Sequence, residues 1–201
     1  VQSGYSAAIK EIQTKLEILD DEFQMRHRRN PIHHMQSRLK TIQSMLEKLK
    51  RKNYEVSINS AVKNLQDIAG IRVICSYVQD VYTIANLLVS QDDVHLVRMA
   101  DYIREPKPNG YRSLHLIVEI PVFLSEGRIL VPVEVQIRTI AMDFWASLEH
   151  SLRYKAQEYI PQHISDELQR VATDIASLDQ RMQAIHDQVD ELSDARSDNA
   201  T

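Results

Sequence analysis

Apolar residues recur with a helical period at both ends of the chain. Near the start they are four and three residues apart in alternation, at Tyr5, Ile9, Ile12, Leu16, Leu19 and Phe23. Near the end the same alternation holds for about four heptads, at Ile164, Leu168, Val171, Ile175, Leu178, Met182, Ile185, Val189 and Leu192. The pattern predicts long helices at residues 1–30 and 161–193 and a flexible polar tail at 194–201. Such narrow apolar stripes must be buried on each other or on a second subunit, which favours a homo-oligomer held by both terminal helices.

The central segment, residues 31–160, mixes helical and alternating periods. Helical spacing predicts helices at residues 41–52, 57–65 and 81–88, and apolar runs predict strands at 71–77 and 94–99. Residues 114–120 and 129–138 alternate like a β-hairpin, and Thr139 is suited to cap a following helix with a stripe at 140, 144, 148 and 152. The strands are few and alternate imperfectly with helices. We therefore expect an α+β fold, a mixed sheet flanked by long N- and C-terminal helices.

One face of the predicted hairpin is polar. If Glu126-Gly127 forms its two-residue loop, paired residues have numbers that sum to 253, so Glu134 lies opposite Glu119 and Arg138 opposite His115. Two facing carboxylates repel unless a cation or proton lies between them, and this register therefore indicates a metal ion. The alternative is an ordinary solvent-exposed face of an antiparallel sheet.

Charge is distributed unevenly within a net charge of −4. Between residues 26 and 52 Lys and Arg far outnumber the single acid Glu47, whereas the last predicted helix is strongly acidic. The four glycines are scattered, which excludes a glycine-rich phosphate loop, so side chains, a metal or a helix N-terminus must hold any phosphate. A basic stripe on the helix at 41–52 suits a polyphosphate, and its members are Lys40, Ser44, Lys48 and Arg51. The alternative is a helix whose basic face is simply solvated.

Two further features suit a nucleotide site. Asp67 precedes the first predicted strand and, with Glu134, can supply the few carboxylate oxygens that Mg²⁺ accepts beside substrate phosphates. Tyr111 follows the constrained loop Pro108-Asn109-Gly110 and could stack on a base, although an ordinary hairpin tyrosine fits equally well.

Composition adds only exclusions. Hydrophobic residues make up 43% and charged residues 26%, which is ordinary for globular proteins and names no function. The single Cys75 excludes an internal disulfide and fits a reducing compartment, and no apolar run approaches a membrane span. We expect a cytoplasmic protein without membrane contact.

Several motifs together resemble a known family. Residues 101–115 read Asp-Tyr-Ile-Arg-Glu-Pro-Lys-Pro-Asn-Gly-Tyr-Arg-Ser-Leu-His, and residues 133–139 read Val-Glu-Val-Gln-Ile-Arg-Thr. With residues 67–73 and 143–150, they resemble the synthetase domain of RelA/SpoT-type alarmone enzymes over about residues 38–155. The short chain and its flanking helices are similar to the single-domain small alarmone synthetases.

This resemblance implies a nucleotidyltransferase-like core that transfers pyrophosphate from ATP to the 3′-hydroxyl of GDP or GTP. AMP is released, and the product (p)ppGpp serves the bacterial stringent response. The resemblance further implies Mg²⁺ as cofactor and a homotetramer. The sequence leaves open a non-catalytic guanosine-nucleotide or RNA-binding module, and a nucleotidyltransferase that releases pyrophosphate. Regulation by RNA or alarmone is not visible in the sequence.

The resemblance also assigns roles to residues. Asp67 and Glu134 match the metal ligands, and Glu134 also matches the general base. The ATP-binding positions are Arg38, Lys40, Ser44, Lys48 and Arg72, of which Arg38 and Arg72 would sandwich adenine. The guanosine-nucleotide positions are Arg104, Lys107, Asn109, Tyr111, His115 and Gln136, with Tyr111 stacked on guanine.

Two positions depart from the family. Ala100 stands where a basic residue is usual, so Arg98 or Arg104 would have to contact the acceptor phosphates. The dipeptide His186-Asp187 is a poor match to the hydrolase motif of long members, because it lies in the heptad helix without companion ligands. We expect no hydrolase activity.

Overall fold

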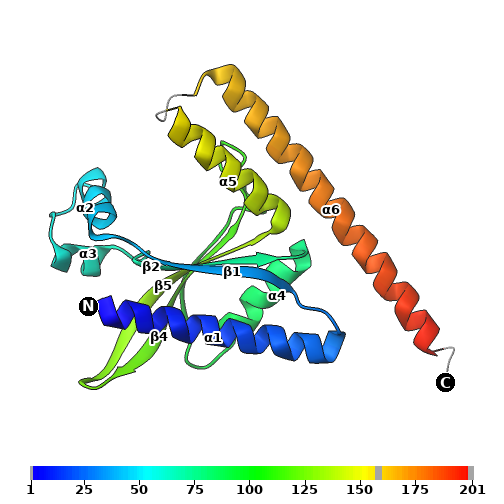
Figure 1. The fold of residues 1–201 in the computed structure, drawn as a ribbon, viewed down its shortest axis with the longest axis horizontal. Coiled ribbons are helices and arrows are strands. Elements are labelled where there is room, and N and C mark those ends of the chain that lie inside the picture. Colours follow the sequence, from blue (N-terminus) through cyan, green and yellow to red (C-terminus); the bar gives the residue numbers. More distant parts are fainter. Residues whose placement is uncertain (1, 157–159, 199–201) are drawn as a thin grey trace.

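The computed structural model describes residues 2–156 and 160–198. Its elements follow the chain from α1 to α6 (Figure 1). The helices are α1 (Gln2–His27), α2 (Ile42–Arg51), α3 (Ile58–Asn64), α4 (Val78–Val89), α5 (Ile140–Lys155) and α6 (Gln162–Asp198). The strands are β1 (Ile32–Leu39), β2 (Ala69–Cys75), β3 (His95–Asp101), β4 (Leu114–Leu124) and β5 (Gly127–Thr139).

The strands form one mixed sheet in the order β1-β2-β5-β4-β3. Strands β2 and β5 are parallel, and the other neighbours are antiparallel. With long helices at both ends of the chain, this arrangement confirms the predicted α+β fold.

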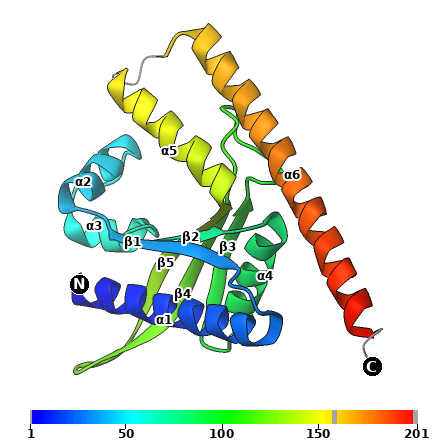
Figure 2. The same ribbon diagram turned by 45° about the vertical axis from the view of Figure 1, so that its right-hand side comes forward.

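Helix α1 lies across one face of the sheet (Figure 2). Its apolar stripe from Tyr5 to Leu19 is buried there, together with α4 and the inward side chains of β2, β4 and β5. The prediction that this stripe pairs with the last helix or with a second subunit is therefore wrong. Alternating Val and Ile residues give the sheet an apolar face wide enough to bury the stripe within the chain.

Strand β1 is the element that the sequence did not predict. It is an edge strand, antiparallel to β2, and most of its side chains are exposed. Its sequence, Ile-His-His-Met-Gln-Ser-Arg-Leu, lacks the apolar alternation of a half-buried strand.

The β4–β5 hairpin forms, but the predicted register is wrong by two residues. Leu124 pairs with Gly127, so Ser125 and Glu126 occupy the loop and paired numbers sum to 251. Gly127 closes the loop at φ +124°, a backbone angle that glycine adopts without strain. Glu119 consequently faces Pro132 instead of Glu134, and the carboxylate pair inferred from the 253 register does not exist.

Helices α5 and α6 lie side by side and antiparallel, and α6 continues past α4 (Figures 1 and 2). Thr139 caps α5 as predicted, because its side chain accepts a hydrogen bond from the Met142 amide. The predicted stripe of α5 is exposed, and Met142, Trp145, Ala146 and Glu149 are buried instead. Helix α6 runs to Asp198, beyond the predicted boundary at 193, and residues 199–201 of the predicted tail lie outside the described residues.

Within residues 2–156 and 160–198, no helix combines the length and apolar character that a membrane crossing requires.

Candidate active site

The sheet face opposite α1 carries a polar cavity of about 180 Å³. Its lining residues come from three neighbouring strands and are Gln36, Arg38, Gly70, Ile71, Arg72, Glu134 and Gln136. Gly70 pairs with Arg38 on β1 and with Glu134 on β5, so the cavity opens where the middle strand has no side chain. A glycine inside a strand marks a place where another molecule can approach the backbone closely.

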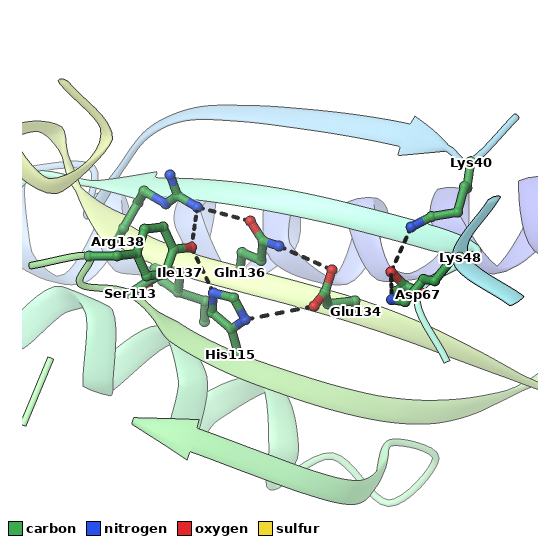
Figure 3. Close-up of polar contacts among 10 residues, drawn as sticks. Lys40, Lys48, Asp67, Ser113, His115, Glu134, Gln136, Ile137 and Arg138 are labelled. Atoms are coloured by element: carbon green, nitrogen blue, oxygen red, sulfur yellow. Dashed lines mark hydrogen bonds and ion pairs between the residues drawn. The ribbon is translucent and has the colours of Figure 1, made fainter. Parts of the chain in front are cut away.

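Beside the cavity, five side chains form a closed ring of polar contacts (Figure 3). Arg138 donates to the Tyr111 hydroxyl at 2.8 Å and to Gln136 Oε1 at 2.9 Å. Gln136 Nε2 donates to Glu134 Oε2 at 3.0 Å. The Tyr111 hydroxyl lies 2.8 Å from His115 Nε2, and His115 Nδ1 faces Glu134 Oε1 at 3.7 Å. The ring fixes the Glu134 carboxylate at the cavity wall.

The direction of these hydrogen bonds follows from Arg138, which can only donate. The Tyr111 hydroxyl accepts from Arg138 and has its own proton to donate to His115 Nε2; in that tautomer the single proton of the neutral His115 lies on Nδ1, toward Glu134. Burial raises the pKa of Tyr111, so this hydroxyl keeps its proton. Burial, aided by the charges of Lys107, Arg138 and Arg98, lowers the pKa of His115 to about 3. His115 is thus a neutral imidazole at physiological pH.

The low pKa of His115 predicts a pH-dependent stability. Between its ordinary value of 6.5 and about 3, the unfolded chain binds a proton that the folded chain does not, so stability falls as pH falls through this window. We expect the free energy of unfolding of the wild type to drop by up to about 1.4 kcal/mol more per pH unit below pH ~6 than that of His115→Gln. Denaturant titrations at a series of pH values measure this, and parallel slopes for the two proteins would contradict a neutral buried His115.

Asp67 lies just before β2, beyond Glu134 along the same face (Figure 3). Lys40 Nζ and Lys48 Nζ contact its Oδ2 at 2.7 and 2.5 Å. Burial acts to raise the pKa of Asp67, but the hydrogen bonds from both lysines outweigh it and hold the pKa below its ordinary value. Two ammonium groups from the β1–α2 segment therefore converge on one carboxylate, and phosphates placed there would meet both.

Within the described part of the chain, the buried side-chain polar atoms that lack a hydrogen-bond partner all lie at this site. They are Asp67 Oδ1, Arg72 Nε and Arg138 Nε. A buried polar atom without a hydrogen-bond partner destabilises the fold. Because these atoms are clustered at one site, we infer that a ligand supplies their partners. The Asp67 oxygen fits a metal ion, although among the described residues no three His, Cys, Asp or Glu side chains gather into a metal site. A metal held here would need substrate phosphates to complete its coordination.

The structure places the predicted residues unequally. Those brought around the cavity and ring are Arg38, Lys40, Lys48, Asp67, Arg72, Tyr111, His115, Glu134 and Gln136. Lys107 Nζ lies over the Tyr111 ring at 4.9 Å, close to the ring of contacts. Arg104 is exposed and pairs with Asp101, and Ser44 bonds to Thr41 at the start of α2. Asn109 holds the loop by contacting Glu149 and the Tyr111 amide.

Three contributors were missed as site residues. Gly70 lies directly before the strand predicted at 71–77 and was given no role, but β2 begins at Ala69 and so includes it. Arg138 was placed on the polar hairpin face without a role. Asp143, which lies 3.4 Å from Arg138 and 3.7 Å from Arg72, connects the start of α5 to both arginines, and nothing local in the sequence distinguishes it.

Comparisons with known proteins agree with this geometry. Residues 37–159 match the family described as the region found in RelA/SpoT proteins. GTP pyrophosphokinase YwaC of Bacillus subtilis is 45% identical over 186 residues, which cover 92% of this chain and 89% of that protein.

Solved structures give the same result. The small alarmone synthetase 2 of Bacillus subtilis superposes with a TM-score of 0.83 at 43% identity, over 92% of this chain and 96% of that one. The small alarmone synthetase 1 of Bacillus subtilis, bound to its product pppGpp, gives a TM-score of 0.84 at 37% identity, over 92% and 94% of the two chains.

Proposed function

Because this chain belongs to the RelA/SpoT family, we propose that it is a GTP pyrophosphokinase. It transfers a pyrophosphate from ATP to the 3′-hydroxyl of GDP or GTP, releases AMP, and thereby supplies (p)ppGpp to the bacterial stringent response in the cytoplasm. The observation that carries the proposal is the polar cavity, which has Glu134 on its wall and the lysine-bound Asp67 beyond it.

ATP binds in the cavity, and its phosphates contact the adjoining lysines. Arg38 pairs with Gly70 from β1, and Arg72 follows Gly70 by two residues on β2, so both side chains line the cavity and adenine would stack between their guanidinium groups. Lys40 and Lys48 lie where the phosphates would extend, and Arg72 Nε is an unpaired donor available to the nucleotide. Ser44, at the start of α2, adds a hydroxyl close to the helix N-terminus.

Asp67 and Glu134 would hold Mg²⁺ together with the phosphates. Asp67 offers its unpaired Oδ1, and Glu134 offers Oε1, which faces His115 only at 3.7 Å. The bound ion would neutralise phosphate charge and acidify the attacking hydroxyl.

The guanosine nucleotide lies on the β4 side of Glu134. Tyr111 offers its ring to guanine, Lys107 offers charge to the phosphates, and the ring of contacts holds Glu134 ready to take the 3′-hydroxyl proton. Positioning and charge neutralisation account for most of the rate of phosphoryl transfer, and a fixed carboxylate beside a cationic cavity provides both.

Incubation with ATP, GDP and Mg²⁺, followed by anion exchange, tests the function. AMP and a more highly charged guanosine product in equal amounts are expected. Free pyrophosphate would instead identify another nucleotidyltransferase, and guanosine-nucleotide binding without turnover would identify a binding module.

We further propose that the protein is a homotetramer held by α6. The exposed side chains of its apolar stripe are Ile164, Val171, Leu178, Met182, Ile185, Val189 and Leu192. A stripe of this length exceeds what a monomer usually leaves in water. Closed symmetry is the usual outcome, and the resemblance to small alarmone synthetases favours four subunits.

Replacing Leu178 and Ile185 together by Glu is expected to reduce the particle to a smaller species in light scattering. The fold should survive, because these side chains are 51% and 52% exposed within the subunit. The matched control, Gln180→Glu with Gln188→Glu, adds the same charge at exposed polar positions of α6 and should leave the mass unchanged. A monomeric wild type at micromolar concentration would contradict the proposal.

A further inference from the structure

The loop that precedes β4 is seated on the C-terminal helix. Gly110 has φ +92°, and a Cβ added to it would lie 2.6 Å from the Ala172 Cβ of α6. The loop backbone therefore contacts α6 at the point where Gly110 and Ala172, both small residues, meet. Arg112 joins the two surfaces, since its Nη1 donates to the carbonyls of Gly110 at 3.2 Å and Ala172 at 3.1 Å.

Further contacts fix α6 against the same region. The Trp145 indole donates to the Leu168 carbonyl at 2.9 Å, and Trp145, Ala146 and Ala172 form a small apolar cluster against which Tyr111 packs. About two turns beyond Ala172, the Thr139 hydroxyl contacts Asp179 at 2.5 Å and simultaneously caps α5. Tyr111, the ring member nearest the acceptor, is thus supported by α6 from behind.

We propose that α6 is a structural part of the acceptor site, and that Arg112 and Ala172 are positioning residues for the guanosine nucleotide. They hold the 107–113 loop in the shape that presents Lys107 and Tyr111, so the nucleotide need not order the loop when it binds. The inference rests on the proposed function, because it takes this loop as the acceptor loop.

The contacts of α6 involve the acceptor side of the site and not the ATP side. The ATP-side groups, Arg38, Lys40 and Lys48, come from β1, α2 and the short segment between them, which are outside the contacts of α6 just described. Loosening the loop should therefore weaken binding of the acceptor and leave that of ATP alone. The exposed apolar stripe lies on an adjoining face of α6, since Val171 is about 100° around the helix from its neighbour Ala172, so assembly and acceptor binding share one helix.

Arg112→Ala and Ala172→Leu test the proposal. We expect the KM for GDP to rise about tenfold or more in each variant, because a part-buried hydrogen-bonded anchor is lost or a close contact is overfilled. The KM for ATP should stay within about twofold. Arg112→Lys, which keeps a donor that can reach one carbonyl, should recover part of the GDP affinity. Asp174→Asn, on an exposed position of α6, is the control and should match the wild type.

Trp145 provides a readout that does not depend on turnover, because it is the only tryptophan of the chain and lies 3.7 Å from the Cβ position of Gly110. Its emission should shift to longer wavelength in Arg112→Ala and return partly in Arg112→Lys. An unchanged KM for GDP, or an equal rise for both substrates, would overturn the inference while leaving the enzyme a synthetase. An inactive wild type would overturn the proposed function, and Trp145 emission would then decide whether α6 holds the loop.

Discussion

Replacing Glu134 with Gln is expected to lower the rate of pyrophosphate transfer by about a thousandfold or more, with ATP affinity changed only a few-fold. Glutamine keeps the shape of the side chain and can still bond to Gln136. It cannot take a proton, and it is a poorer metal ligand. Single-turnover measurement of AMP release, with calorimetry of a non-hydrolysable ATP analogue, separates the loss of chemistry from any loss of binding.

Glu119→Gln is the matched control for this variant. Glu119 lies on the neighbouring strand of the same hairpin, but it pairs with Pro132 and does not line the cavity. The rate of synthesis by Glu119→Gln and the dependence of that rate on Mg²⁺ concentration should match those of the wild type. A Glu134→Gln rate within about tenfold of the wild-type rate would remove Glu134 from the role of general base.

Replacing Arg138 with Met is expected to lower the free energy of unfolding by about 3 kcal/mol and also to impair synthesis. Only 3% of the Arg138 side chain is exposed, and its loss removes the donor to Tyr111 and Gln136 and one of the two arginines that face Asp143. Asp143 is 29% exposed and can regain water, which keeps the expected loss at the lower end of the range for broken buried pairs.

Urea unfolding followed by circular dichroism measures this loss, and turnover is compared at a temperature where the variant is folded. Arg128→Met is the control, since Arg128 is exposed on the same strand. A stability loss no larger than that of the control would show that the ring of contacts contributes nothing to the fold.

The polar face of the hairpin was predictable from sequence although its register was not. Side chains alternate with a period of two, so an error of two residues leaves Glu134, Gln136, Arg138 and His115 on the same face and changes only their neighbours. The actual register depends on Gly127 closing the loop, a choice among turns that the alternation itself cannot make.

Other parts of the site depend on packing across the sheet. Strand β1 carries few apolar residues because it is an edge strand, and its sequence gives little sign of the strand that brings Arg38 beside Gly70. The helical period of α1 predicted an apolar stripe correctly, but only the assembled sheet shows what covers it. The exposure of the α5 stripe likewise depends on where α6 docks.

The ring of contacts also determines where a proton can go after the chemical step. Two series of polar contacts lead from Arg138 to Glu134. One runs through Tyr111 and His115, whose Nδ1 faces Glu134 at 3.7 Å, and the other runs through Gln136 as hydrogen bonds. A proton captured by Glu134 cannot travel back along either series, because each would have to reverse and end on a guanidinium that accepts no proton. The ring is therefore not a proton wire. In the proposed mechanism Glu134 would hold the proton and return it through the open cavity, toward the departing AMP or the solvent that replaces it.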